Sequence, residues 1–254
     1  MWSRNLLLAK LKAWGIHLGI SALIFLPLLW LLLFRWFPAP LFVTDGGWQG
    51  LRIMLGVDMV LGPLLTLMIF NPAKSRRETL FDFSCIGLIQ AVALCFGAYS
   101  IEQKRPWTLA WYEGAFSAIA RDVYREQSGV TPEAWQRFGE SPIYRVYVRK
   151  PQTAEEQSGA AAYEVMESIS PAGLFFLYEP FEAHWNTMRS QALDMNMLTV
   201  KDDGLRARLT ALQEKHAGQN LLFFAHNGYF RSAYVALDQT GRYLDAIYVD
   251  TPKP

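Results

Sequence analysis

Three long apolar segments dominate the first 105 residues of the chain. Residues 14–34 and 83–101 contain no Lys, Arg, Asp or Glu, and residues 53–70 contain a single acid, Asp58. About 20 apolar residues in a helix cross the ~30 Å hydrocarbon core of a bilayer. The pattern therefore predicts an integral membrane α-helical module with three spans within residues 1–105. A cleaved signal peptide fits the first segment less well, because its apolar run exceeds the usual length of about 7–15 residues and no small-residue cleavage motif follows it.

Residues 106–254 predict a separate α+β domain of mixed pattern. Residues 106–112 and 115–120 predict a hairpin with Gly114 in its turn, and a helix through Tyr124 is the competing interpretation of the second strand. Further predicted elements are a strand at 143–148 and helices at 160–168, 181–197 and 202–216.

The carboxyl-terminal pattern is the clearest part of this domain. Residues 221–225, 229–237 and 243–249 alternate apolar and polar positions, and turn signals separate them at Asn227-Gly228 and at 239–241. Alternation with such turns predicts an antiparallel three-stranded meander.

Composition and charge separate the two halves further. The whole chain is 52% hydrophobic and 14% aromatic, which is rich for a soluble protein. Residues 1–105 hold 10 Lys/Arg against 5 Asp/Glu, whereas residues 106–254 hold 14 against 18. These balances argue against a disordered chain, an ordinary cytosolic enzyme and a nucleic-acid binder with a basic face, so no nucleic-acid partner is expected.

The positive charges of the short flanks predict the orientation. Lys and Arg residues that flank the inner ends of the spans are Arg4, Lys10, Lys12, Lys74, Arg76 and Arg77. Those that flank the outer ends are Arg35, Arg52, Lys104 and Arg105. Because cytoplasmic flanks carry the excess of positive charge, the pattern predicts a cytoplasmic N-terminus and a domain outside the cytoplasm, in the periplasm of a Gram-negative bacterium.

Cysteine usage agrees with this arrangement. Cys85 and Cys95 both lie in the third apolar segment, about 15 Å apart along a helix, which is too far for a disulfide between them. Residues 106–254 contain no cysteine, so that domain must fold on its hydrophobic core alone.

Motifs for catalysis, metals and cofactors do not stand out in the sequence. The four histidines show no metal-ligand spacing, and no nucleophile elbow, phosphate-binding loop or dinucleotide-binding glycine motif is present. We therefore predict no catalytic residues, no metal ligands and no cofactor. An enzyme whose residues meet only in the folded chain stays open at this point.

Interaction sites are more readily predicted in the apolar segments. Gly15 and Gly19 form a small-xxx-small pair that lets another helix approach closely. Gly62-Pro63 follows Asp58 by one turn and should loosen or kink the second span. Asp58 lies inside this span, where an acid is costly unless it is paired or hydrated. Either it is neutral or bonded to Gln90 or to the backbone inside the bundle, or it pairs with a cationic group of a client helix.

The short connection before the second span carries another candidate site. Gly46 and Gly47 permit positive φ and a tight turn, and Trp48 can anchor at the membrane interface. The segment is interpreted first as such a turn and second as a contact with a client. The complete set of predicted partner-binding residues is Gly15, Gly19, Asp45, Gly46, Gly47, Trp48, Asp58, Gly62 and Pro63.

Several of these residues belong to runs that are characteristic of one family. The runs are PLFVTDGGWQG at 40–50, GVDMVLGPLLTL at 56–67, NPAK at 71–74, GIHL at 15–18, FDF at 81–83 with Gln90, RP at 105–106 and LDQTG at 237–241. Together they resemble the type IV pilin accessory proteins of the TfpX/TfpZ family. The resemblance is dense over residues 13–107 and thin between 120 and 220.

The resemblance implies a function in the assembly of type IV pili. It implies a multi-pass protein of the bacterial inner membrane that assists pilin stability or pilus assembly by direct contact with the pilin subunit. Its implied partners are the pilin, the lipid bilayer and other pilus assembly proteins. Pilins wait in that membrane with an apolar helix that carries a near-terminal glutamate and a free amine, and a groove of small residues with a semi-buried acid suits such a client.

Two other classes of function remain open. A membrane enzyme that modifies pilin or a lipid-linked substrate would need an external catalytic cluster, which the sequence does not display. A sensor would need a cytoplasmic output domain, and the predicted inner flanks are only about 13 and 12 residues long.

Overall fold

The structure, a computed structural model, describes residues 4–139, 142–198, 200 and 202–249. The ends of the two predicted domain ranges, residues 1–3 and 250–254, lie outside the described residues. The chain divides into two compact units. The helical unit contains Met1–Trp36 and Gly47–Gln103, and the α+β unit contains Phe37–Gly46 and Lys104–Pro254. We call residues 37–46 the first connection. The predicted border after residue 105 stays a prediction, and the structure adds that the first connection packs with the α+β unit.

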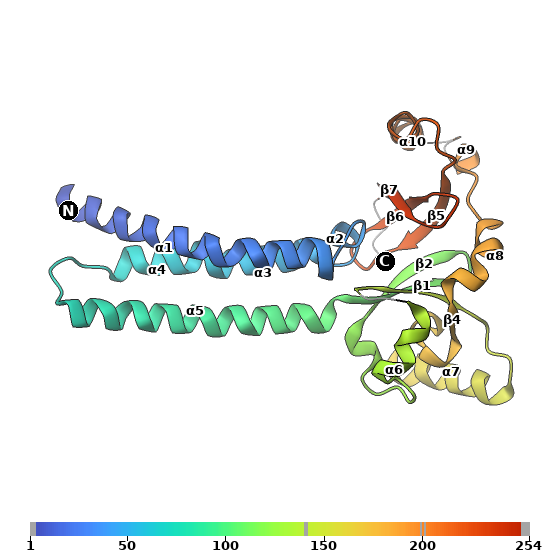
Figure 1. Cartoon of the computed structure of the whole chain (residues 1–254), viewed down its shortest axis with the longest axis horizontal. Helices are drawn as coiled ribbons and strands as arrows, with labels where there is room; N and C mark the ends of the chain where they lie inside the picture. The colour runs from blue at the N-terminus through green and yellow to red at the C-terminus, as the bar shows by residue number, and fades with distance from the viewer. Residues whose placement is uncertain (1–3, 140–141, 199, 201, 250–254) are drawn as a thin grey trace. The chain divides into compact units, whose positions relative to one another are not determined.

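All three predicted apolar segments are helical. The helices of this unit are α1 (Arg4–Leu31), continued by a π-helical turn (Leu32–Trp36), α3 (Gly47–Leu55), a second π-helical turn (Gly56–Leu61), α4 (Gly62–Ile69) and α5 (Arg76–Lys104) (Figure 1). Three helical stretches, Arg4–Trp36, Gly47–Ile69 and Arg76–Lys104, are long and apolar enough to cross a membrane. The prediction of three long apolar helices is confirmed by their length and composition.

The second helix departs from regular α-geometry where the sequence predicts it. The π-helical turn Gly56–Leu61 ends directly before Gly62-Pro63, which form the start of α4. Proline has no N–H for the helix ladder, and its ring crowds the carbonyl of the preceding turn, so a wider turn accommodates it. The loosening predicted at Gly62-Pro63 therefore occurs one turn earlier, as the π-helical turn Gly56–Leu61, while Gly62 and Pro63 themselves belong to α4.

The α+β unit is built on a mixed seven-stranded sheet with the order β4-β3-β1-β2-β5-β6-β7. Its strands are β1 (Pro106–Tyr112), β2 (Ala115–Ala120), β3 (Tyr144–Val148), β4 (Tyr178–Pro180), β5 (Leu222–Asn227), β6 (Ser232–Leu237) and β7 (Tyr243–Val249). β1 pairs with β3 and β2 with β5 in parallel, and the remaining pairs are antiparallel. The predicted hairpin β1–β2 is confirmed, with Gly114 at φ +88°, and so is the antiparallel meander β5–β6–β7.

Short helices complete the core of this unit. They are α2 (Leu41–Thr44), α6 (Pro132–Trp135), α7 (Ala154–Glu167), α8 (Trp185–Arg189), α9 (Met195–Leu198) and α10 (Asp203–Lys215). α6 and α7 pack against β1 and β3, whereas leucines of α10 pack against the meander (Figure 1). The helix predicted at 202–216 is confirmed, with Asp202 accepting a hydrogen bond from the N–H of Leu205 at 2.8 Å as its N-cap. α7 begins earlier than predicted because Thr153 caps it.

One predicted helix is wrong as a continuous element. Residues 181–197 form a 3₁₀ turn (Phe181–His184), α8 and α9, with an interruption between the last two. At the interruption the N–H of Leu193 donates to the carbonyl of Phe223 in β5 at 2.7 Å. Asp194 then accepts from the N–H of Asn196 at 3.0 Å and starts a new turn. These bonds to the sheet and to a short acid replace the helix ladder.

Candidate functional site

The first connection packs against the loop between β5 and β6. The carbonyl of Thr44 accepts hydrogen bonds from the backbone N–H groups of Phe230 at 2.8 Å and Arg231 at 3.3 Å. The carboxylate of Asp45 accepts from the N–H of Tyr229 at 3.2 Å. A Cβ atom on Gly228 would lie only 2.6 Å from Cβ of Thr44, so glycine permits this close approach. The predicted site residue Asp45 thus has partners within its own chain.

A buried hydrogen-bonded pair, His226 and Asp45, forms the centre of this junction. Nε2 of His226 lies 2.8 Å from Oδ2 of Asp45, and the two side chains are 1% and 5% exposed. The hydroxyl of Thr44 donates to the same carboxylate oxygen at 2.6 Å. Because a carboxylate only accepts, Nε2 of His226 carries the proton of this bond. Three donors therefore satisfy Asp45 in a buried setting, where a missing partner is costly.

The junction explains why β6 begins later than the sequence predicts. The alternation indicates a strand from residue 229, but β6 starts at Ser232. The backbone donors of residues 229–231 bind Thr44 and Asp45 in place of a facing strand. The prediction for residues 229–231 is therefore wrong, because a tertiary contact takes their hydrogen bonds.

A small cavity of about 150 Å³ lies beside the junction. Pro38, Ala39, Pro40 and Leu41 of the first connection form one wall, and residues of the sheet and of its adjoining loops form the other. Arg145 and His226 are polar groups in an otherwise largely apolar lining. A cavity of this size accommodates a group about as large as one benzene ring.

The helical unit contains a second polar cluster that joins its three helices. Nδ1 of His17 in α1 lies 2.6 Å from the hydroxyl of Thr66 in α4, and Nε2 lies 2.8 Å from Oε1 of Gln90 in α5. The amide oxygen only accepts, so Nε2–H of His17 donates to it, and Nδ1 shares a hydrogen bond with the hydroxyl of Thr66. Polar side chains that bond across apolar helices hold the helices in register.

Asp58 borders this cluster and is enclosed by the unit. Its side chain is buried, with Ser21 of α1 as a hydrogen-bonding neighbour. The amide of Gln90 donates to the backbone carbonyl of Asp58 at 3.4 Å, and Oδ2 of the carboxyl group has no hydrogen-bond partner among the described residues. Gln90 thus bonds the backbone of Asp58 and not its carboxyl group.

Gly62 and Lys10 complete the packing of the helices. A Cβ on Gly62 would overlap the carboxamide of Gln90, so this glycine creates the space that Gln90 fills. Nζ of Lys10 donates to the carbonyls of Leu67 at 3.0 Å and Met68 at 3.1 Å. A cation on the last carbonyls of α4 complements the negative end of that helix.

The other predicted site residues lie apart from these clusters. A Cβ on Gly15 or Gly19 would meet no atom within 4 Å, so this face of α1 is open in the structure. Gly46 has φ +109°, which only glycine adopts readily, whereas Gly47 is a buried helical residue at the start of α3. Of the glycine pair, only Gly46 uses the positive φ that the sequence suggested for both. Trp48 is exposed, with Arg52 5.0 Å from its ring centroid.

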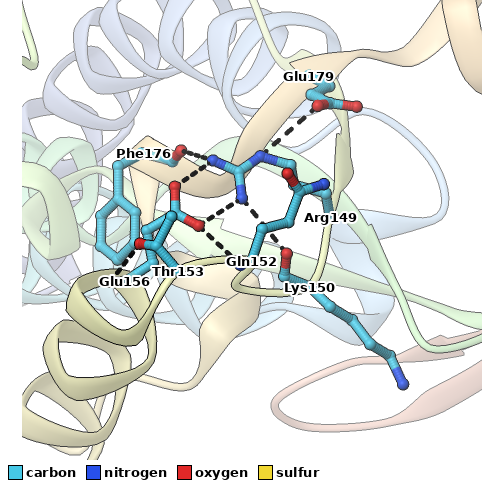
Figure 2. Close-up of polar contacts among 7 residues, drawn as sticks. All are labelled: Arg149, Lys150, Gln152, Thr153, Glu156, Phe176 and Glu179. Carbon is cyan, nitrogen blue, oxygen red and sulfur yellow. Dashed lines mark hydrogen bonds and ion pairs between the residues drawn. The ribbon is translucent and has the colours of Figure 1, made fainter.

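A third polar cluster joins α7 to β3 and β4 of the α+β unit (Figure 2). The guanidinium of Arg149, at the end of β3, binds both carboxylate oxygens of Glu156 in α7, at 2.8 and 2.5 Å. Its Nε lies 3.6 Å from Glu179 in β4. The bonds from Arg149, followed by the N–H of Gln152, lower the pKa of Glu156 from 4.5 to about 2. The cluster holds α7 against the edge of the sheet, and the carboxylates of Glu156 and Glu179 are both engaged by Arg149.

Sequence reasoning did not select His17 or His226 as site residues. For His17 a signal exists, because Ser21 follows it by one helical turn and the two form a polar stripe on an apolar helix. His226 carries no comparable local signal, since its partner Asp45 is 181 positions away in the chain.

The fold defines the class of protein as a helical unit joined to an α+β unit. It combines a helical unit with three potential membrane spans and an α+β unit that incorporates the connection between the first two spans. No family model matches the chain, and no solved structure matches it.

Three relatives share the same description. The fimbrial assembly protein of serogroup I from Dichelobacter nodosus is 27% identical over 255 residues, which cover 97% of each chain. The serogroup E1 protein of that organism is 31% identical over 56% of this chain and 53% of its own length. The protein of serogroups C1 and C2 is 37% identical over 41% of this chain and 77% of its own length. The chain belongs to the family of these fimbrial assembly proteins.

Proposed function

We propose that the chain is an inner-membrane accessory protein that assists type IV pilin stability or pilus assembly by direct contact with the pilin. The observation that carries the proposal is the relationship to a fimbrial assembly protein along 97% of both chains. Because that similarity spans both units, we extend the assembly role to the helical and the α+β unit together.

The geometry of α1 supports a helix as the form of pilin that is bound. On the face that bears Gly15 and Gly19, a Cβ added to either glycine would have no neighbouring atom within 4 Å, and close approach of a second helix needs such small residues. Ile16 and Ile20 beside them are also exposed and offer apolar contact area. An apolar pilin helix in the same bilayer is the client that we propose for this face.

The polar cluster supports the same proposal by supplying a rigid partner. His17, Thr66 and Gln90 bond to one another across three helices, so the α1 surface is held by its own unit before a client arrives. A preorganised surface loses less conformational freedom on binding. In this proposal Asp58 serves the interior of the bundle, because its side chain is only 4% exposed.

The orientation that we propose has the N-terminus in the cytoplasm and the α+β unit in the periplasm. Its support is the excess of Lys and Arg at the ends that we assign to the cytoplasm. Alkaline phosphatase fused after Gly241 should be active, and the same enzyme fused after Arg77 should be inactive. The reverse pattern would overturn the orientation.

A strain that lacks the gene distinguishes an assembly role from an enzymatic one. The proposal is non-catalytic, so surface pili should decrease while the mass of the pilin stays the same. A changed pilin mass would favour a pilin-modifying enzyme. Expression of the full chain should restore piliation, which excludes an effect on neighbouring genes.

A further inference from the structure

We propose that the loop between β5 and β6 is a membrane anchor, and that Tyr229 and Phe230 insert into the lipid headgroup region of the bilayer. This inference rests on the proposed function in one respect, namely that the three long helices cross the membrane. It assigns a lipid-binding surface to the α+β unit, in a segment that the sequence pattern places in a strand.

The two aromatic side chains are unusually exposed for their size. Tyr229 is 86% exposed and Phe230 is 48% exposed, at adjacent positions of one loop. Their ring centroids lie 4.9 Å apart at an interplanar angle of 76°, so they form one aromatic pair. Aromatic rings, tyrosine with its polar tip above all, settle where hydrocarbon meets headgroups.

The contacts of the loop place it beside the first connection. Phe230 donates its N–H to the carbonyl of Thr44, and Tyr229 donates its N–H to Asp45. A Cβ on Gly46 would lie 3.1 Å from the ring of Phe230. α2, within the first connection, lies next to this hairpin (Figure 1).

The first connection must lie at a membrane surface if its flanking helices span. It contains only residues 37–46, between the end of one candidate span at Trp36 and the start of the next at Gly47. The chain therefore leaves and re-enters the bilayer within this segment. The bonds from the loop to Thr44 and Asp45 therefore hold the aromatic pair at the segment where the chain meets that surface.

The loop is also held in one conformation. His226, near the end of β5 just before the loop, is bonded to Asp45, and Gly228 within the loop allows close contact with Thr44. An anchor that is fixed before binding loses little conformational freedom when it enters the headgroups. The exposed pair Val165 and Met166, at the end of α7, has no hydrogen bond to the first connection among the described residues and provides a matched control.

Depth-dependent fluorescence quenching tests the anchor in the full chain. Cys85 and Cys95 are replaced by serine, and single cysteines at Tyr229, Val165 or Leu88 carry an environment-sensitive fluorophore. The protein is reconstituted in vesicles of phosphatidylethanolamine and phosphatidylglycerol with nitroxides near the headgroups or at mid-chain. Both leaflets contain the quencher, so the orientation of insertion does not affect the result.

The anchor predicts a distinct result at each position. The label in Tyr229→Cys should be quenched at least twofold more by the headgroup nitroxide than by the mid-chain nitroxide. Leu88→Cys, on an exposed face of α5, should be quenched most by the mid-chain nitroxide, and Val165→Cys by neither. If Tyr229→Cys yields little folded protein, Asn227→Cys reports from the exposed last residue of β5, next to the same loop.

Three outcomes would overturn the anchor, each for a separate reason. A water-exposed label at residue 229 with a lipid-buried label at residue 88 would reject the anchor and keep the spans. A blue-shifted label at residue 229 that neither nitroxide quenches would indicate a protein contact in place of lipid. A label at residue 88 that is not quenched would reject the spanning helices on which the proposed function stands.

Discussion

Removal of the Asp45 carboxylate should destabilise the α+β unit strongly. Asp45→Ala deletes the acceptor for the imidazole of His226, which is 1% exposed, and for the N–H of Tyr229. Leaving the buried imidazole N–H and the buried Thr44 hydroxyl without this acceptor costs about 1–3 kcal/mol for each group. At about 2–4 °C per kcal/mol for a unit of this size, a total loss of about 2–6 kcal/mol should lower the melting temperature by about 4–24 °C.

A double-mutant cycle separates the pair from the general cost of truncation. Asp45→Ala and His226→Ala should each destabilise, and the double variant should lose clearly less than the two losses added together. The coupling should be about 1.5–3 kcal/mol, since the two groups are in direct contact. Asp203→Ala is the control, because that carboxylate is 94% exposed and its removal should stay within about 0.5 kcal/mol.

The assay is thermal unfolding of the full chain in detergent, followed by near-ultraviolet circular dichroism. The aromatic core around Trp111 and Trp135 belongs to the α+β unit and reports on its packing. A melting temperature of Asp45→Ala within about 2 °C of the unmodified chain, the effect of less than 1 kcal/mol, would refute the junction. Strict additivity of the two single variants would refute a direct interaction of Asp45 with His226.

Three further predictions concern the other clusters. Glu156→Gln should lower the melting temperature at pH 7 but not near pH 2, because Arg149 holds the pKa of Glu156 at about 2. The stabilisation from the Glu156 carboxylate is complete above its ordinary pKa of 4.5 and disappears as the pH falls through 2. An equal difference in melting temperature at both pH values would contradict this. Asp58→Asn keeps the shape of an enclosed side chain and removes its charge, so thermal stability and pilin co-purification should be unchanged or slightly higher. A decrease of about 5-fold or more in co-purified pilin, at an equal level of the variant, would mean that Asp58 contacts the pilin. Gly62→Ala should reduce the amount of folded protein in the membrane, because the new Cβ overlaps the side chain of Gln90. Gln90→Ala in the same chain should restore part of that amount. If it restores none, the overlap with Gln90 does not cause the loss.

The parts of the fold that the sequence predicts are those with a repeated local signal. Long runs without charge predict the three apolar helices, and strict alternation with turn residues predicts the meander. Gly114 also marks its turn correctly, since its positive φ is a local property of the backbone. In each case the residues that form the element carry the information themselves.

The parts that the sequence does not predict depend on contacts between distant segments. Residues 229–231 alternate like a strand, but Thr44 and Asp45 take their hydrogen bonds. Residues 181–197 have helical spacing, but Leu193 bonds to β5 and interrupts the helix. No local pattern connects Asp45 to His226, so their pairing appears only in the folded chain.

The candidate site shows the same division. Asp58 stands out in the sequence because an acid is costly within an apolar helix, and Gly62-Pro63 stands out because proline removes a backbone donor from the helix. Their neighbours His17 and Gln90 come from the first and third helices, and the contact is a product of helix packing. The sequence thus indicates where polar residues lie along each helix. It does not indicate which of them contact one another in the folded chain.

Site-specific photocrosslinking in pilus-producing cells tests direct contact with the pilin most directly. A photoreactive amino acid is placed at Ile16 or Ile20 on the open face of α1, and at Val165 in the α+β unit as a control. After irradiation of intact cells, the full chain is purified and its adducts are identified by mass spectrometry. We expect a pilin adduct from Ile16 or Ile20 and none from Val165. Absence of a pilin adduct at both α1 positions, in cells where the variants still support normal piliation, would contradict direct contact through this face.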